Sequence, residues 1–283
     1  MKRKEKTITD RDVINSLPKN RREVFFDLLK HRKMTLFTLS CFVFMFFIPL
    51  AVDLFIFNFL ESVASQNEQY EYLFSLVFYS MLIALPCVII GFLGLTGGFY
   101  VAKKIVWQDG VVVPTDFFTG IKENWLHGIA DGILFGLALF GLVVGGSYLF
   151  VYAPVHAVVK GVGIGGMILI FIVIGIITAL NLTQSVYYSN SYLRTFRNSF
   201  SFMGLLNWKV LVLFVLSTGG VIALCCFNMI LLGVGLFLFA ILNSVVIVLY
   251  TLIAHSAFDK YINKEHYPEY VGKGLYKTND KEA

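Results

Sequence analysis

The chain has 283 residues, of which 57% are hydrophobic and only 14% are charged. Its mean hydropathy is +0.75, whereas soluble domains carry about 25% charged residues. A soluble fold of this size could not cover so much apolar surface, so lipid must be the solvent for most of it. The net charge of +5 does not indicate nucleic acid as a partner, because the basic residues flank apolar runs and do not form a hydrophilic face.

Six apolar stretches are long enough to cross a bilayer as helices, which takes about 20 residues each. In chain order they are Met34–Leu60, Leu73–Val101, Asp131–Tyr152, Val162–Tyr187, Leu205–Phe227 and Leu231–His255. The sequence therefore predicts an all-α integral membrane protein with six transmembrane helices.

Lysine and arginine are distributed unequally between the two sides of these spans. All of them except Lys160 fall in the N-terminal segment, the second and fourth connections, or the C-terminal tail. Positive residues resist translocation, so this side should be cytoplasmic, next to the anionic inner leaflet of a cell membrane. We expect a basic cytoplasmic segment at residues 1–33, a transmembrane domain at 34–257 and a polar cytoplasmic tail at 258–283, of which residues 265–283 should be mobile.

A short basic amphipathic stretch precedes each odd-numbered span. Two large apolar residues come first, another lies four positions after the first, and a cation follows it directly. Because positions i and i+4 share a helix face, the pattern predicts interfacial helices at about residues 22–31, 116–125 and 191–199, each leading one of three helical hairpins. The candidate interaction residues of these helices are Phe25, Lys30, Phe117, Lys122, Trp125, Phe196 and Arg197. The alternative is that any span with basic flanks has this composition.

The candidate polar site within the membrane is Asp53, with Pro49 and Pro86 nearby. A carboxylate at mid-span costs about 2.5–3.5 kcal/mol on insertion scales, so Asp53 should face protein or water. Each proline leaves a carbonyl of its helix without a donor, and broken helices that meet near mid-membrane are typical of transporter sites. The alternative is that Asp53 is hydrated near the outer surface and that the prolines only shape packing.

Small residues in two spans predict close helix packing. Gly128, Gly132 and Gly136 recur every four residues, and Gly94 with Gly98 is the candidate partner for this stripe.

Asp131 and His127 lie near the start of the third span, where we expect the carboxylate to be solvated at the interface. Two such groups are too few for a metal site. The sequence contains no catalytic, cofactor or metal motif, so we expect neither an enzyme nor a cofactor.

Three stretches carry a family resemblance. Gly97–Lys104, Asp116–Trp125 and Tyr187–Asn198 together resemble the YesL-like family of bacterial membrane proteins, and the likeness covers roughly residues 20–255. That family is of uncharacterised molecular function, and its members are associated with carbohydrate uptake. The resemblance implies an accessory or regulatory membrane component, with transporter subunits as candidate partners. The alternative is a small-solute transporter that uses Asp53 and the two proline breaks.

Overall fold

A computed structural model describes residues 18–66, 70–205, 207–220, 222 and 229–276. Within these ranges all regular elements are helical. Parts of three expected segments lie outside the described residues, namely 1–17 of the N-terminal segment, 206, 221 and 223–227 of the fifth span, and 277–283 of the tail.

Five of the described helices are long and apolar enough to cross a membrane, and there are six if the bent pair 192–205 and 208–219 counts as one span. The expectation of an all-helical protein with several helices able to span a membrane is therefore confirmed for the described residues. The long elements are α3 (Lys33–Gln66), α4 (Tyr70–Val106), α5 (Val113–Phe140) with its continuation η1 (Gly141–Gly145) and α6 (Gly146–Val151), α7 (Ala157–Tyr187), and α11 (Met229–Phe258).

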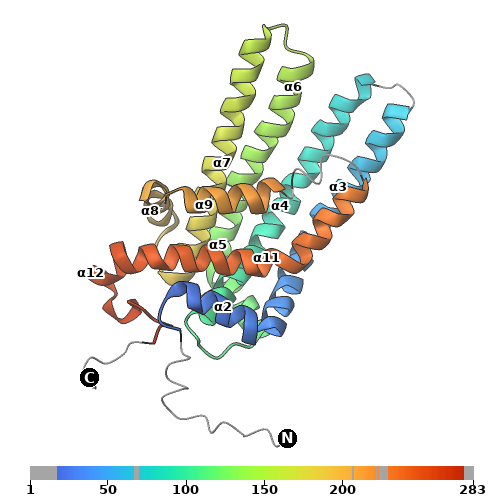
Figure 1. Cartoon of the computed structure of the whole chain (residues 1–283). Helices are drawn as coiled ribbons and strands as arrows, with labels where there is room; N and C mark the ends of the chain where they lie inside the picture. The colour runs from blue at the N-terminus through green and yellow to red at the C-terminus, as the bar shows by residue number, and fades with distance from the viewer. Residues whose placement is uncertain (1–17, 67–69, 206, 221, 223–228, 277–283) are drawn as a thin grey trace, which may run out of the picture.

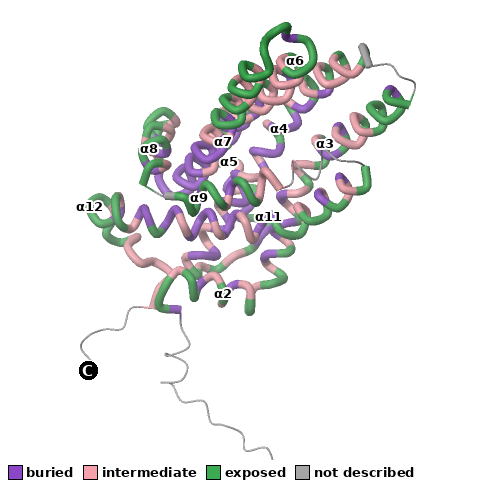
Figure 2. Tube along the Cα trace, turned by 45° about the horizontal axis from the view of Figure 1, so that its top comes forward, coloured by how far each residue is buried: buried purple, intermediate pink, exposed green. Residues whose placement is uncertain are grey.

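Two helical hairpins form the centre of the molecule (Figure 1). The first is α3 with α4, and the second is α5 with α7. Figure 2 shows buried residues gathered where α4, α5 and the end of α7 meet, whereas α6 and the start of α7 are largely exposed. The core therefore lies toward one end of the bundle.

The glycine stripe of α5 packs against α4. An added Cβ at Gly132 would lie 2.9 Å from the backbone Cα of Ile89, so the two helices touch almost backbone to backbone. The predicted partner was wrong, however. Gly94 faces Phe46 of α3, and Gly98 lies between α3 and α11, because these two glycines are on another face of α4.

The three-hairpin arrangement is not confirmed. The fifth expected span begins as α9 (Asn207–Phe214) and η2 (Val215–Gly219), and α9 packs on α7. Helix α11 instead runs obliquely across α3 and α4 (Figure 1). Polar contacts favour this arrangement, because the Ser40 hydroxyl of α3 lies 2.8 Å from the Ser244 hydroxyl, and Asn243 donates to the Ser40 carbonyl at 3.2 Å.

The three expected leading segments are all helical. They are α2 (Arg21–His31), the first part of α5, and α8 (Tyr192–Leu205). Helix α5 is interrupted at Asn124, which has φ −123° and ψ 17°. The Asn124 side chain donates to the Gly120 carbonyl at 3.2 Å, and such local bonds compete with the helical backbone. The short helix and the third span are thus two segments of one element.

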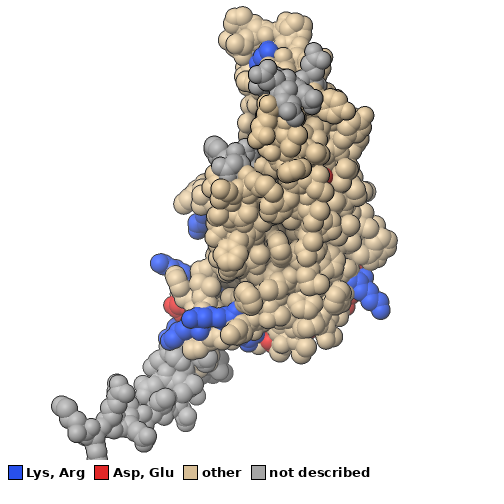
Figure 3. Space-filling model, turned by 90° about the vertical axis from the view of Figure 1, so that its right-hand side faces the viewer, with Lys and Arg blue, Asp and Glu red and all other residues tan. Residues whose placement is uncertain are grey.

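We call the region formed by α2 and residues 103–125, 188–197 and 259–273 the basic end. Most of the lysine and arginine side chains visible in Figure 3 gather there. Both ends of the described chain meet in this region, since the Tyr276 amide donates to the Pro18 carbonyl at 2.9 Å.

The expected mobile tail is packed against the bundle as far as Tyr276, so that expectation is wrong for this part. After α11 the chain continues through η3 (Asp259–Asn263), α12 (Lys264–His266) and η4 (Pro268–Tyr270). Aromatic residues of this segment explain the packing, because Tyr267 contacts the Tyr188 ring and Tyr270 contacts the Trp107 ring.

Candidate functional site

A buried polar cluster joins α5, α7 and α8 near the basic end. Its centre is the carboxylate of Asp131, which is 0% exposed. The Asn181 amide nitrogen of α7 lies 2.8 Å from both carboxylate oxygens, and the Tyr192 hydroxyl of α8 donates to the same carboxylate at 2.9 Å. These bonds tie the start of α8 to the two helices of the second hairpin.

The expectation that Asp131 is solvated at the interface is wrong. Helix α8 lies over this position and excludes solvent, and sequence spacing cannot show this because Tyr192 is 61 residues away. Some signal was available, since Asp131 and Asn181 are polar residues that both lie toward the basic ends of their spans. The sequence thus indicates polar residues of the cluster, but not the hydrogen bonds that join them.

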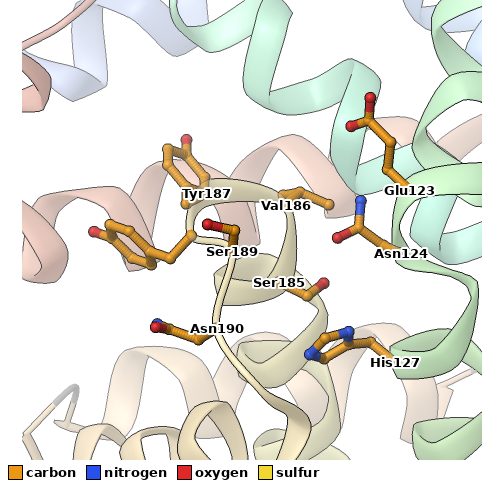
Figure 4. Close-up of a pocket in the computed structure, with 9 residues that line it drawn as sticks. Glu123, Asn124, His127, Ser185, Val186, Tyr187, Ser189 and Asn190 are labelled. Carbon is orange, nitrogen blue, oxygen red and sulfur yellow. The ribbon is translucent and has the colours of Figure 1, made fainter.

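A cavity of about 580 Å³ opens at the basic end, between the break in α5 and the link from α7 to α8. Figure 4 shows Asn124 and His127 projecting from α5 toward Ser185 at the end of α7, with Ser189 and Asn190 on the link. The lining residues are Glu123, Asn124, His127, Ser185, Val186, Tyr187, Tyr188, Ser189 and Asn190. None of these residues was a predicted site residue, because they come from two segments about 60 residues apart.

Polar contacts at Asp259 connect the two ends of the chain beside this cavity. Arg21 of α2 forms an ion pair with Asp259 at 2.9 Å, and its other terminal nitrogen donates to the Lys273 carbonyl at 2.7 Å. The Tyr188 hydroxyl donates to Asn263 at 2.6 Å. Burial raises the pKa of Tyr188 above its ordinary value, so this phenol remains a donor at neutral pH. The basic end is therefore one connected unit.

Asp53 is buried between α3 and α4, at 7% exposure. The Ser80 hydroxyl of α4 donates to its carboxylate at 3.1 Å. The carboxylate therefore faces protein, in agreement with the expectation for Asp53. The two prolines do not join it, because Pro49 and Pro86 are both exposed on outward faces of their helices. The predicted group of Asp53, Pro49 and Pro86 is thus not one site.

The candidate interaction residues divide into exposed and buried ones. Lys30, Lys122, Trp125 and Arg197 are exposed at the basic end, whereas Phe25 and Phe196 are half-buried.

Phe117 is 0% exposed and cannot meet a partner or a lipid. It packs against the rings of Phe42 and Phe46 of α3, because the first part of α5 crosses α4 closely at Gly97. The neighbouring Phe118 is exposed instead. The prediction that Phe117 belongs to an interaction surface is therefore wrong.

Among the described residues, no three histidine, cysteine, aspartate or glutamate side chains come together as a metal site. Comparisons of the chain with family models, with curated proteins and with solved structures found no match.

Proposed function

We propose that this protein is a multi-pass protein of the bacterial cell membrane, related to the YesL-like family, that works as an accessory or regulatory component of carbohydrate uptake. In this proposal the basic end faces the cytoplasm and is the surface that meets transporter subunits and anionic lipid. The observation that carries it is the basic end itself. Ion pairs and buried hydrogen bonds unite α2, α5, α8 and the C-terminal segment there.

Exposed side chains at this end are suited to such contacts. Trp125 and Leu193 present apolar surface, and Lys122 and Arg197 lie near them in sequence on the same two helices. Aromatic and arginine side chains are the residues that most often dominate protein interfaces. Lysine and arginine next to a membrane are also attracted to anionic headgroups, by about 1 kcal/mol each.

The alternative function is a small-solute transporter with a site at Asp53. It is favoured by one observation, the burial of this carboxylate between two long helices with Ser80 as its hydrogen-bond partner. The outward position of Pro49 and Pro86 weakens it, because helix breaks of transporter sites line the site.

Affinity purification from native membranes tests the proposed function against this alternative. We expect subunits of a sugar transporter to co-purify with the wild-type protein and with Asp53→Asn. Their recovery should fall at least about fivefold with Trp125→Ala combined with Arg197→Ala, because such residues contribute more than about 1 kcal/mol at interfaces. Absence of transporter subunits from the wild-type sample would contradict the proposal. Normal recovery with loss of solute uptake in Asp53→Asn would favour the transporter.

The proposed orientation predicts which sites react with a membrane-impermeant thiol reagent. In a background without the four native cysteines, a cysteine at Ser65 should react from outside the cell and one at Thr278 only after lysis. Ser65 is exposed near the end of α3 away from the basic end. Labelling of Thr278 in intact cells would refute the orientation.

A further inference from the structure

The cavity at the basic end has the size of a small-molecule site. Its volume of about 580 Å³ lies within the range of about 300–1,000 Å³ that is usual for ligand pockets. It is formed where two segments far apart in the sequence meet, at the non-helical Asn124 and at the link after α7. Each wall combines helical residues with an irregular segment, and side chains converge on the same space from both walls.

The lining groups are mostly polar and include both donors and acceptors. Asn124 and Asn190 supply amides, Ser185 and Ser189 supply hydroxyls, and His127 supplies an imidazole. Amide and hydroxyl side chains can both donate and accept hydrogen bonds. A ligand with many hydroxyl groups has the same double capacity, and therefore matches this lining better than a ligand with acceptors alone.

Two lining residues also carry a polar atom that lacks a partner. The Nε2 atom of His127 and the Tyr187 hydroxyl are buried and have no hydrogen-bond partner among the described residues. Buried polar atoms are nearly always hydrogen-bonded, so an orphan atom in a cavity wall requires an explanation. A polar molecule bound in the cavity would supply such a partner.

The charge of the site favours a neutral ligand. Glu123 contributes a carboxylate to the lining. The Lys103 ammonium lies just behind the wall, where it donates to the carbonyl of the lining residue Val186, and Glu123 is among the charges that act on it. The negative charge of the wall is thus offset by a nearby positive charge.

We infer that this cavity binds a neutral, polyhydroxylated small molecule, of the class of mono- and disaccharides. The inference deepens the proposed function, on which it rests, by assigning a ligand class to the basic end. A bound sugar would touch α5 and the link to α8 together. The His127 ring also lies 5.7 Å from the Tyr192 ring, so occupancy would act on α8, which carries Arg197.

The test is direct binding to the full-length protein in nanodiscs that contain no glycolipid and no glycosidic detergent. The probes are glucose, galactose, mannose, maltose, lactose and sucrose, measured by calorimetry and by the ligand-dependent rise in melting temperature. We expect saturable binding of at least one of them. Glucosamine and glucuronate serve as charged analogues and should bind no more tightly than glucose. A glucosyl diacylglycerol included in the nanodiscs should reduce the binding of free sugar only if the natural ligand is the headgroup of a lipid.

Two substitutions locate the binding. Ser189→Trp should fill the cavity and reduce the affinity at least about tenfold, as should His127→Ala through loss of a hydrogen bond to the ligand. Ser191→Trp is the matched control, because Ser191 is exposed two residues further along the chain and does not line the cavity. It should bind like the wild-type protein. All three proteins should first give the same elution profile and melting temperature without ligand.

Failure of all six sugars to bind the wild-type protein would overturn the inference. Equal binding by Ser189→Trp and wild type would do the same, as would a charged analogue that binds at least about tenfold more tightly than its neutral parent. If sugars do not bind but transporter subunits still co-purify, only the ligand assignment is lost. If sugars bind but no subunits co-purify, the accessory function is lost and the binding site remains.

Discussion

Replacement of Gly132 by alanine is expected to destabilise the protein by about 1–3 kcal/mol, the usual cost of forcing extra volume into a packed interface. The new Cβ would lie 2.9 Å from the Ile89 Cα and 3.2 Å from the Phe92 Cβ. The first of these atoms belongs to the backbone of α4, so no side-chain rotation can relieve the clash. Gly132→Leu should not fold. Thermal unfolding of the purified protein, together with its yield in membranes, measures both effects.

The matched control is Gly165→Ala, because an added Cβ at Gly165 of α7 meets nothing within 4 Å. Alanine is favoured over glycine in a helix by about 1 kcal/mol, so this variant should be at least as stable as the wild type. Equal melting temperatures for Gly132→Ala and Gly165→Ala would show that α4 and α5 do not approach as closely as described.

Replacement of Asp131 by alanine should cost about 2–6 kcal/mol, because two buried donors lose their acceptor and each such donor costs about 1–3 kcal/mol. The donors are the Asn181 amide and the Tyr192 hydroxyl. Asp131→Asn keeps one oxygen as an acceptor and should therefore lose less stability. The free energy of unfolding in detergent measures the loss for each variant. Faster hydrogen exchange in residues 192–199 should accompany it, because Tyr192 connects α8 to α5.

A double-mutant cycle separates this connection from general damage. Asp131→Ala and Tyr192→Phe each remove one side of the same hydrogen bond, so the effects of the two changes should not add. The interaction free energy between the two changes should be about 0.5–3 kcal/mol, as it is for residues in direct contact. Additive effects, or unchanged exchange in α8, would refute the role of Asp131 as its attachment.

Much of the secondary structure can be predicted from the sequence, because it depends on local patterns. The apolar runs locate five long helices and part of a sixth span, and the spacing of apolar and basic residues locates α2, the first part of α5, and α8. The burial of Asp53 is predictable for the same reason, since hydrocarbon cannot solvate a carboxylate whatever its neighbours are. Each of these properties requires only a helix and a lipid environment.

Contacts between distant segments could not be predicted in this way. A glycine stripe indicates close packing, but both α4 and α5 carry small residues, and only the rotation of α4 decides which of its faces meets Gly132. Phe117 has the spacing of an interfacial residue, yet the close crossing at Gly97 places it in the core. The same limit applies to the cavity, whose two walls meet only after the second hairpin has closed.

The sequence by itself thus determined that this protein is helical, that most of it is apolar enough to lie in lipid, and that its cations concentrate in a few segments. These features follow from composition and from a period of 3.6 residues, which act over a few turns of helix. Only the tertiary structure decided that α11 packs on α3, that Asp131 is buried beneath α8, and that the C-terminal segment folds onto α2. Those outcomes depend on hydrogen bonds between residues 61 to 238 positions apart, and a local pattern carries no information on such pairs.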